Sequence, residues 1–218
     1  MTTFPNSPAV LKGGLVLIDP VTAAVLRVIA LQYNPDTLSR TLQPKAVTDA
    51  QDRSQALRLT GTPVETIKLE AEIDATDQLE FPEQNQVAAQ AGVFPALSAL
   101  ETVIYPTSAQ LQANNQLADS GTLEILPMET PLALFVWSQR RIVPVRITEF
   151  SVTEEAFDVA LNPIRVKVSL GMRVLSVDDL GFQHKGGGLF MSYLQQKEQL
   201  AAQSAGAVLR TLGLTRIS

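Results

Sequence analysis

Residues 164–174 read IRVKVSLGMRV, and this stretch decides the fold class. Apolar side chains occupy every second position, and polar residues or glycine stand between them. A period of two places alternate side chains on opposite faces of a β-strand. The stretch therefore predicts a long strand with one buried face and one wet face, and the wet face carries Arg165, Lys167 and Arg173.

Further strands are predicted on both sides of this one. Residues 67–74 alternate in the same way, and residues 13–33 predict a hairpin with its turn at an Asp-Pro dipeptide. Residues 132–137, LALFVW, form a continuous apolar run, which is typical of a strand buried on both faces. The alternation over 143–153 changes phase after Glu149, which indicates a bulge.

The middle of the chain has a different composition. Alanine, glutamine and leucine dominate residues 83–104, and Val93, Leu97, Leu100 and Ile104 fall on one helical face. Residues 107–120 carry few apolar side chains and form either a second short helix or an exposed loop. Pro95 fits the first turn of such a helix, where its missing N–H has no intrahelical partner to lose. We therefore predict a helical insertion in a mainly β (α+β) fold.

The tail is predicted to be a separate element. Gly186–Gly188 are typical of a flexible joint, and a helix carrying Phe190 and Leu194 on its apolar side follows them. An isolated helix of this length is marginal in water, so it must pack on its own domain or on a partner, and we favour the partner. The chain then divides into an N-terminal arm (1–12), a β domain (13–179), a glycine-rich hinge (180–188) and a C-terminal helix (189–218).

Composition excludes several classes of function. A net charge of −5 argues against a nucleic-acid ligand, because such domains usually carry a basic surface. The absence of cysteine excludes disulfides, thiol nucleophiles and thiolate metal sites, and it is compatible with a reducing cytoplasm. No apolar run approaches the roughly 20 residues of a membrane span, and the N-terminus does not resemble a signal peptide.

The sequence shows no recognisable group of catalytic residues. His184 is the single histidine, and we expect an ordinary surface residue there. The adjacent carboxylates at 154–155 and 178–179 point to opposite faces if they lie on strands, so we expect solvated turn residues and not an acid/base pair. We expect no enzyme, no cofactor and no metal site; an enzyme would need two carboxylates roughly 5–9.5 Å apart in a cleft.

Charge and aromatic residues give candidates for subunit contacts. Residues 65–83 hold seven acidic residues and one basic residue, whereas the strand at 164–174 is basic on its polar face. Two solvated sheet faces explain this pattern, and complementary contact across subunits is the alternative. Trp137 is either a core residue or an interface anchor. The interface candidates are Glu70, Glu72, Asp74, Trp137, Arg165, Lys167, Arg173, Phe190 and Leu194.

One combination of segments resembles a known family. Residues 28–40, VIALQYNPDTLSR, run from an extended strand into a Gln-Tyr-Asn-Pro segment, and LFVWS at 134–138, VRITEFS at 145–151 and the run 157–170 follow later. Together they resemble the tube-type proteins of contractile injection systems. Members of that family are tube-initiator or baseplate-adaptor subunits of antifeeding-prophage-like particles, and they often carry a C-terminal LysM module. Ser138 replaces the more usual glycine, and the tail is too short for a LysM module.

The resemblance implies a β-barrel or sandwich like that of phage tail-tube proteins, without catalysis. It implies a homo-hexameric ring that contacts the inner tube protein and the spike, hub and baseplate proteins of a particle assembled in a prokaryotic cytoplasm. Several long strands leave free edges that need partners, and a ring in which each copy pairs with the next supplies them. The alternatives are the main inner-tube subunit, or a ligand- or carbohydrate-binding β-sandwich, although only 6% of the residues are aromatic.

Overall fold

The computed structural model describes residues 10–46, 58–119, 130–204, 206 and 209–216. Within them, seven strands form one antiparallel sheet in the order β2-β1-β5-β6-β7-β4-β3, which confirms the mainly β (α+β) fold class. The strands are β1 Gly14–Ile18, β2 Val25–Ala30, β3 Leu38–Gln43, β4 Val64–Asp74, β5 Leu132–Ser138, β6 Arg141–Phe157 and β7 Pro163–Val174. The helices are α1 Thr76–Leu79, α2 Gln86–Ala91, α3 Phe94–Glu101, α4 Ser108–Asp119, α5 Val177–Leu180 and α6 Lys185–Gln203, followed by the 3₁₀ turn η2 Leu209–Leu212.

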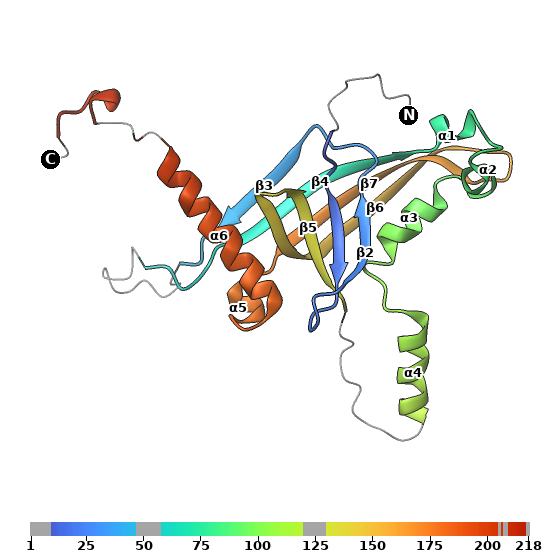
Figure 1. Cartoon of the computed structure of the whole chain (residues 1–218), viewed down its shortest axis with the longest axis horizontal. Coiled ribbons are helices and arrows are strands. Elements are labelled where there is room, and N and C mark those ends of the chain that lie inside the picture. Colours follow the sequence, from blue (N-terminus) through green and yellow to red (C-terminus); the bar gives the residue numbers. More distant parts are fainter. Residues whose placement is uncertain (1–9, 47–57, 120–129, 205, 207–208, 217–218) are drawn as a thin grey trace.

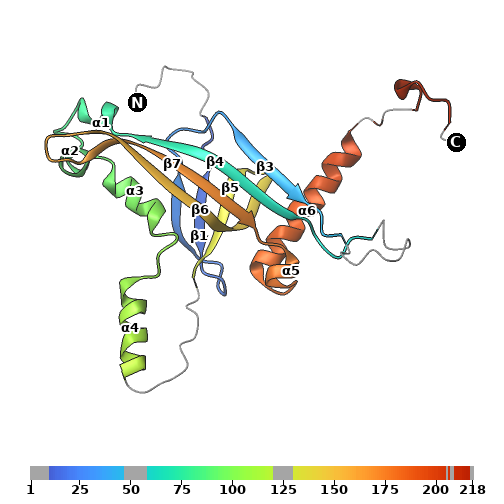
Figure 2. The same ribbon diagram turned by 180° about the vertical axis from the view of Figure 1, so that it is seen from behind.

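Strand β6 belongs to both halves of the sheet. Its first residues, Arg141–Val145, pair with β5, and its remainder pairs with β7 as far as Phe157. The register shifts between Ile147 and Glu149, so the bulge predicted from the phase change is confirmed. In Figures 1 and 2 the short strands β1, β2 and β5 cross the long strands β4, β6 and β7, and the core lies between these two halves.

The alternating residues of the predicted strands form this core. On β7, Val166, Val168, Leu170 and Met172 are buried, whereas Ile164 is half-buried. The other half of the sheet contributes buried side chains, including Leu15 and Phe135. Helix α3 and its N-cap add Leu97, Leu100 and Val93, and Pro95 lies in its first turn as predicted. Ile104 lies beyond the helix and is 44% exposed, so its predicted place on this face is wrong.

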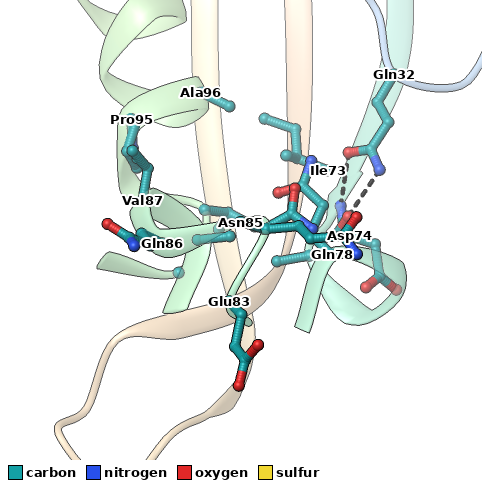
Figure 3. Close-up of a pocket in the computed structure, with 15 residues that line it drawn as sticks. Gln32, Ile73, Asp74, Gln78, Glu83, Asn85, Gln86, Val87, Pro95 and Ala96 are labelled. Carbon is teal, nitrogen blue, oxygen red and sulfur yellow. Dashed lines mark hydrogen bonds between the residues drawn. The ribbon is translucent and has the colours of Figure 1, made fainter. Parts of the chain in front are cut away.

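The Gln32–Asn34 segment ties the two halves together. The Gln32 amide nitrogen donates to the Asp74 carbonyl oxygen at 2.7 Å, and its oxygen accepts from the Asp74 N–H at 2.9 Å (Figure 3). The Asn34 oxygen accepts from the Gly13 N–H at 2.9 Å, and its nitrogen donates to the Leu11 carbonyl at 2.8 Å. Both side chains therefore hydrogen-bond as a neighbouring backbone would, one to the end of β4 and one to the start of β1.

The predicted glycine hinge is wrong, because Gly186–Gly188 form the first turn of α6. His184 caps this turn, and its Nδ1 accepts from the Gly186 N–H at 3.0 Å. A Cβ at position 187 would lie 3.1 Å from the Gly181 carbonyl carbon and closer still to its oxygen. Glycine is needed here because the helix backbone touches the preceding loop, not because the segment bends.

The first half of α6 packs on its own chain, so the expectation that it docks on a partner is corrected there. Phe190 and Tyr193 are buried in the main core, and Leu194 packs against it half-buried. Beneath the helix, Glu65 of β4 is 3% exposed and accepts the Tyr193 hydroxyl at 2.9 Å. The Glu65 carboxylate also binds Lys197 at 2.9 Å and Arg40 of β3 at 3.1 Å, which joins α6 to the sheet.

The peripheral segments differ in how closely they contact the sheet. The helices between β4 and β5 begin at Thr76, earlier than the predicted insertion at 83–120. Helix α4 has no buried residue and extends away from the sheet (Figure 1). Most of the predicted N-terminal arm lies outside the described residues, as does part of the predicted C-terminal helix beyond Ser204.

Candidate functional site

Acidic and basic interface candidates meet on one face of the sheet. Because β4 pairs with β7, Asp74 lies opposite Arg165, Glu72 opposite Lys167 and Glu70 opposite Ser169. Arg165 Nε binds Asp74 at 2.7 Å and Glu72 at 3.5 Å. The charges that the sequence assigned to two separate segments are therefore neighbours within one chain.

Three more basic side chains of this face are also paired. Lys167 binds Glu155 of β6 at 3.1 Å, and this hydrogen bond raises the pKa of Lys167. Arg173 binds Asp179 at 2.6 Å, and Lys68 binds Glu149 at 2.6 Å. We call this surface the polar sheet face; its charged members are Lys68, Glu70, Glu72, Asp74, Arg146, Glu149, Glu155, Arg165, Lys167 and Arg173. Five bases against five acids make the face neutral, so it has no strong preference for a polyanion or a polycation.

Two carboxylates that follow the sheet hold loops in place. Asp178 accepts from Lys45 at 2.9 Å and from the Thr62 N–H and hydroxyl at 3.2 and 3.0 Å. The Lys45 ammonium is the main reason why the pKa of Asp178 lies below its ordinary value. Asp179 completes a capping box with Ser176 at the start of α5. These adjacent carboxylates lie in the first turn of α5 and bind different partners, so the expectation of solvated turn residues is corrected.

Trp137 packs within its own chain. Its ring stacks on Phe135 with centroids 5.9 Å apart, and a Cβ on Gly13 would come within 2.6 Å of it. The side chain is half-buried. The core interpretation of Trp137 therefore explains its contacts, and a role between subunits stays a prediction.

Unpaired strand edges are the main open feature of the sheet. Among the described residues, β3 pairs only with β4, and β2 pairs only with β1. Strand β5 stops pairing with β6 at Val145, so residues 149–157 of β6 pair only with β7. The four-stranded part β3-β4-β7-β6 thus ends in two free edges on opposite sides.

The turn between β6 and β7 exposes three large apolar side chains. Phe157, Val159 and Leu161 are 50%, 107% and 76% exposed, and we call residues 157–161 the hairpin tip. The Asp158 carboxylate accepts from the Ala160 N–H at 2.7 Å and from the Asn162 N–H and side-chain amide, both at 2.8 Å. Asn162 also donates to the Gln90 carbonyl of α2 at 3.2 Å. The hydrogen bonds hold the hairpin tip in one shape.

Sequence reasoning identified a turn here but missed the tip. Leu161 has a φ of 63°, in the left-handed region that bulky residues rarely adopt. Such backbone geometry costs free energy, and it often accompanies a functional role. The available signal was the run Phe-Asp-Val-Ala-Leu, which places three large apolar residues where a hairpin turn normally carries polar ones.

A cavity beside the end of β4 does not present a catalytic arrangement. It measures about 560 Å³ and lies between the end of β4 and helices α1 to α3 (Figure 3). Glu83 points away from Asp74 in this view. Burial alone would raise the pKa of Asp74. Asp74 also binds Thr76 and Arg165, and these hydrogen bonds outweigh burial, so its pKa is lowered. No group of three potential metal-binding side chains occurs in the described part of the chain.

Comparison with known proteins gives weak matches only. No family model and no curated protein matches the chain. One similar solved structure is a chain from the tail of an empty gene transfer agent particle with C6 symmetry; it is 14% identical, with a TM-score of 0.29. Another comes from the virion of a native gene transfer agent particle, at 13% identity and a TM-score of 0.28. Each match covers 74% of this chain and 90% of the other. Both TM-scores lie below 0.5, too low to establish a shared fold.

No helix within the described ranges is both long enough and apolar enough to cross a membrane.

Proposed function

We propose that this chain is a structural subunit of a phage-tail-like contractile injection particle, and that six copies form a ring joining the inner tube to the spike and baseplate. The pair of free edges on the four-stranded part β3-β4-β7-β6 is the observation that carries the proposal. Free edges of this kind attract other strands, so a soluble protein normally blocks or pairs them. The resemblance of the Gln-Tyr-Asn-Pro segment and its companions to tube-type proteins supports the same function.

The direction of the strands allows one copy to pair with the next. Neighbouring strands alternate in direction across the sheet, so β3 of one copy is antiparallel to β6 of the next. Pairing β3 with residues 149–157 is a heterologous contact, and such contacts generate a ring when the rotation closes. The four-stranded parts then make a continuous barrel, and the polar sheet face lines its channel while the core side faces outward.

The main inner-tube subunit is the alternative within the same class. The same free edges serve it equally well. Helix α4, which has no buried residue, and the additional helices favour an adaptor, because an adaptor needs surfaces for unlike neighbours. Electron microscopy of the particle distinguishes the two by the number of layers that this chain occupies.

The test combines that imaging with an edge variant. Thr41 lies on the exposed edge strand β3, and Thr41→Lys places there a charge of the kind that natural proteins use to block pairing. We expect ring formation to fail while the melting temperature is kept. Gln195→Lys, at an exposed position of α6, is the matched control and should assemble normally. A particle with one or three copies of this chain in a layer would refute the ring.

A further inference from the structure

Tyr33 is an exposed aromatic residue on a fixed backbone. The neighbouring side chains Gln32 and Asn34 each make two hydrogen bonds to backbone groups, and Leu31 donates to the Gly13 carbonyl at 2.9 Å. The peptide chain at this point therefore has little freedom. The Tyr33 side chain is nevertheless 41% exposed, and Pro35 follows it on the way into β3.

The hairpin tip has the same combination of rigidity and exposure. Asp158 fixes its backbone, and Phe157, Val159 and Leu161 project from it. Binding elements that are already held in their bound shape lose less conformational entropy on association. Tyrosine is also enriched among residues that dominate interface energies. Both features thus have the properties of interface anchors.

Antiparallel pairing places the two features side by side. In the ring of the proposed function, on which this inference rests, the start of β3 at Leu38 faces the end of β6 at Phe157 in the next copy. Tyr33 and Pro35 immediately precede β3, and the hairpin tip immediately follows β6. The tip of one copy therefore continues the strand contact and reaches the segment 33–36 of its neighbour.

We propose that the hairpin tip packs against Tyr33 and Pro35 of the neighbouring copy and thereby sets the register of the ring. The contact is apolar and aromatic, and it adds side-chain specificity to a backbone pairing that alone tolerates slippage. The occupant of the Tyr33 surface is a second copy of this chain.

Cross-linking tests the contact, because the chain has no cysteine. Asp36→Cys and Ala160→Cys, introduced together, flank the contact and leave its anchors intact; both positions are exposed. Oxidation of assembled particles should give a ladder of covalent oligomers up to the hexamer. The control combines Asp36→Cys with Val21→Cys, an exposed position in the β1–β2 turn, and should remain monomeric.

A second variant tests the energetics. Val159→Asp should lower the yield of rings about tenfold or more while the monomer melts as before, because this side chain touches little of its own chain. Val21→Asp, matched in exposure, should assemble normally. Rings that give no covalent ladder, or a Val159→Asp variant that assembles at the normal yield, would overturn the inference and leave the proposed function standing. Absence of rings from the unmodified chain in its particle would overturn the proposed function itself.

Discussion

Replacing Gly187 by alanine tests whether the glycine run is a tight contact or a joint. A Cβ at position 187 meets the backbone of Gly181, at a distance below the 3.0 Å that real Cβ atoms respect. Either α6 or the loop before it must move to restore ordinary contact near 3.4 Å. At Gly188, by contrast, an added Cβ meets nothing within 4 Å.

The two substitutions form a matched pair. Both gain the helix propensity of alanine over glycine, about 1 kcal/mol, so this term cancels in the comparison. What remains is the overpacking at position 187, which costs about 1–3 kcal/mol. For a chain of this size, that difference corresponds to about 2–12 °C in the melting temperature.

Thermal unfolding followed by circular dichroism, with urea unfolding beside it, measures the difference. We expect Gly188→Ala to melt at or above the temperature of the unmodified chain and Gly187→Ala to melt below Gly188→Ala. The global transition reports on α6 because Phe190 and Tyr193 are part of the main core. Equal melting temperatures for the two variants would show that the glycines are a joint and that the contact with Gly181 does not matter.

Three further predictions concern the sheet and its ion pairs. Val168→Asp should destabilise the fold by about 3–5 kcal/mol in urea unfolding, because Val168 is 0% exposed and the new charge has no partner. Lys167→Asp, on the opposite face, should fold with only a small loss of stability. Equal losses for the two variants would mean that the strand phase is wrong. Glu65→Leu should cost about 1–3 kcal/mol, since the Tyr193 hydroxyl loses its buried acceptor, and an unchanged urea midpoint would contradict this. The pKa of Asp178 is lower in the folded state, so its contribution to folding stability is present above the ordinary pKa near 4 and is lost as the pH falls through the lowered pKa. Asp178→Asn should therefore flatten the dependence of stability on pH below about 4. An unchanged loss of stability in acid would refute the role of Lys45.

Much of the sheet could be predicted from local pattern alone. The alternation over 164–174 gives the buried face of β7 because a period of two is a local property of a strand. The phase change after Glu149 gave the bulge for the same reason, since one extra residue reverses the faces. Local sequence therefore suffices for strands, faces and irregularities within them.

Other features depend on contacts that local pattern does not encode. A glycine that allows close backbone approach has the same letter as a glycine in a linker, so Gly187 was misinterpreted. The acidic residues near Glu72 and the basic residues near Arg165 were noticed, but their pairing depends on β4 lying beside β7. The hairpin tip was missed because apolar residues near a turn usually turn inward, and only the structure shows Val159 outside.

Strand β6 gives the subunit a mechanical axis. It runs for 17 residues, roughly 55 Å, from the half that holds β5 to the hairpin tip, with one bulge between Ile147 and Glu149. A push on the tip therefore reaches the far half through covalent bonds, and not through side-chain packing alone. The hydrogen bonds that join β7 to β4 and β6 to β5 would be loaded along the strands, so that many must break together before the hairpin slides. Single-molecule pulling from residue 159 should therefore show a high rupture force.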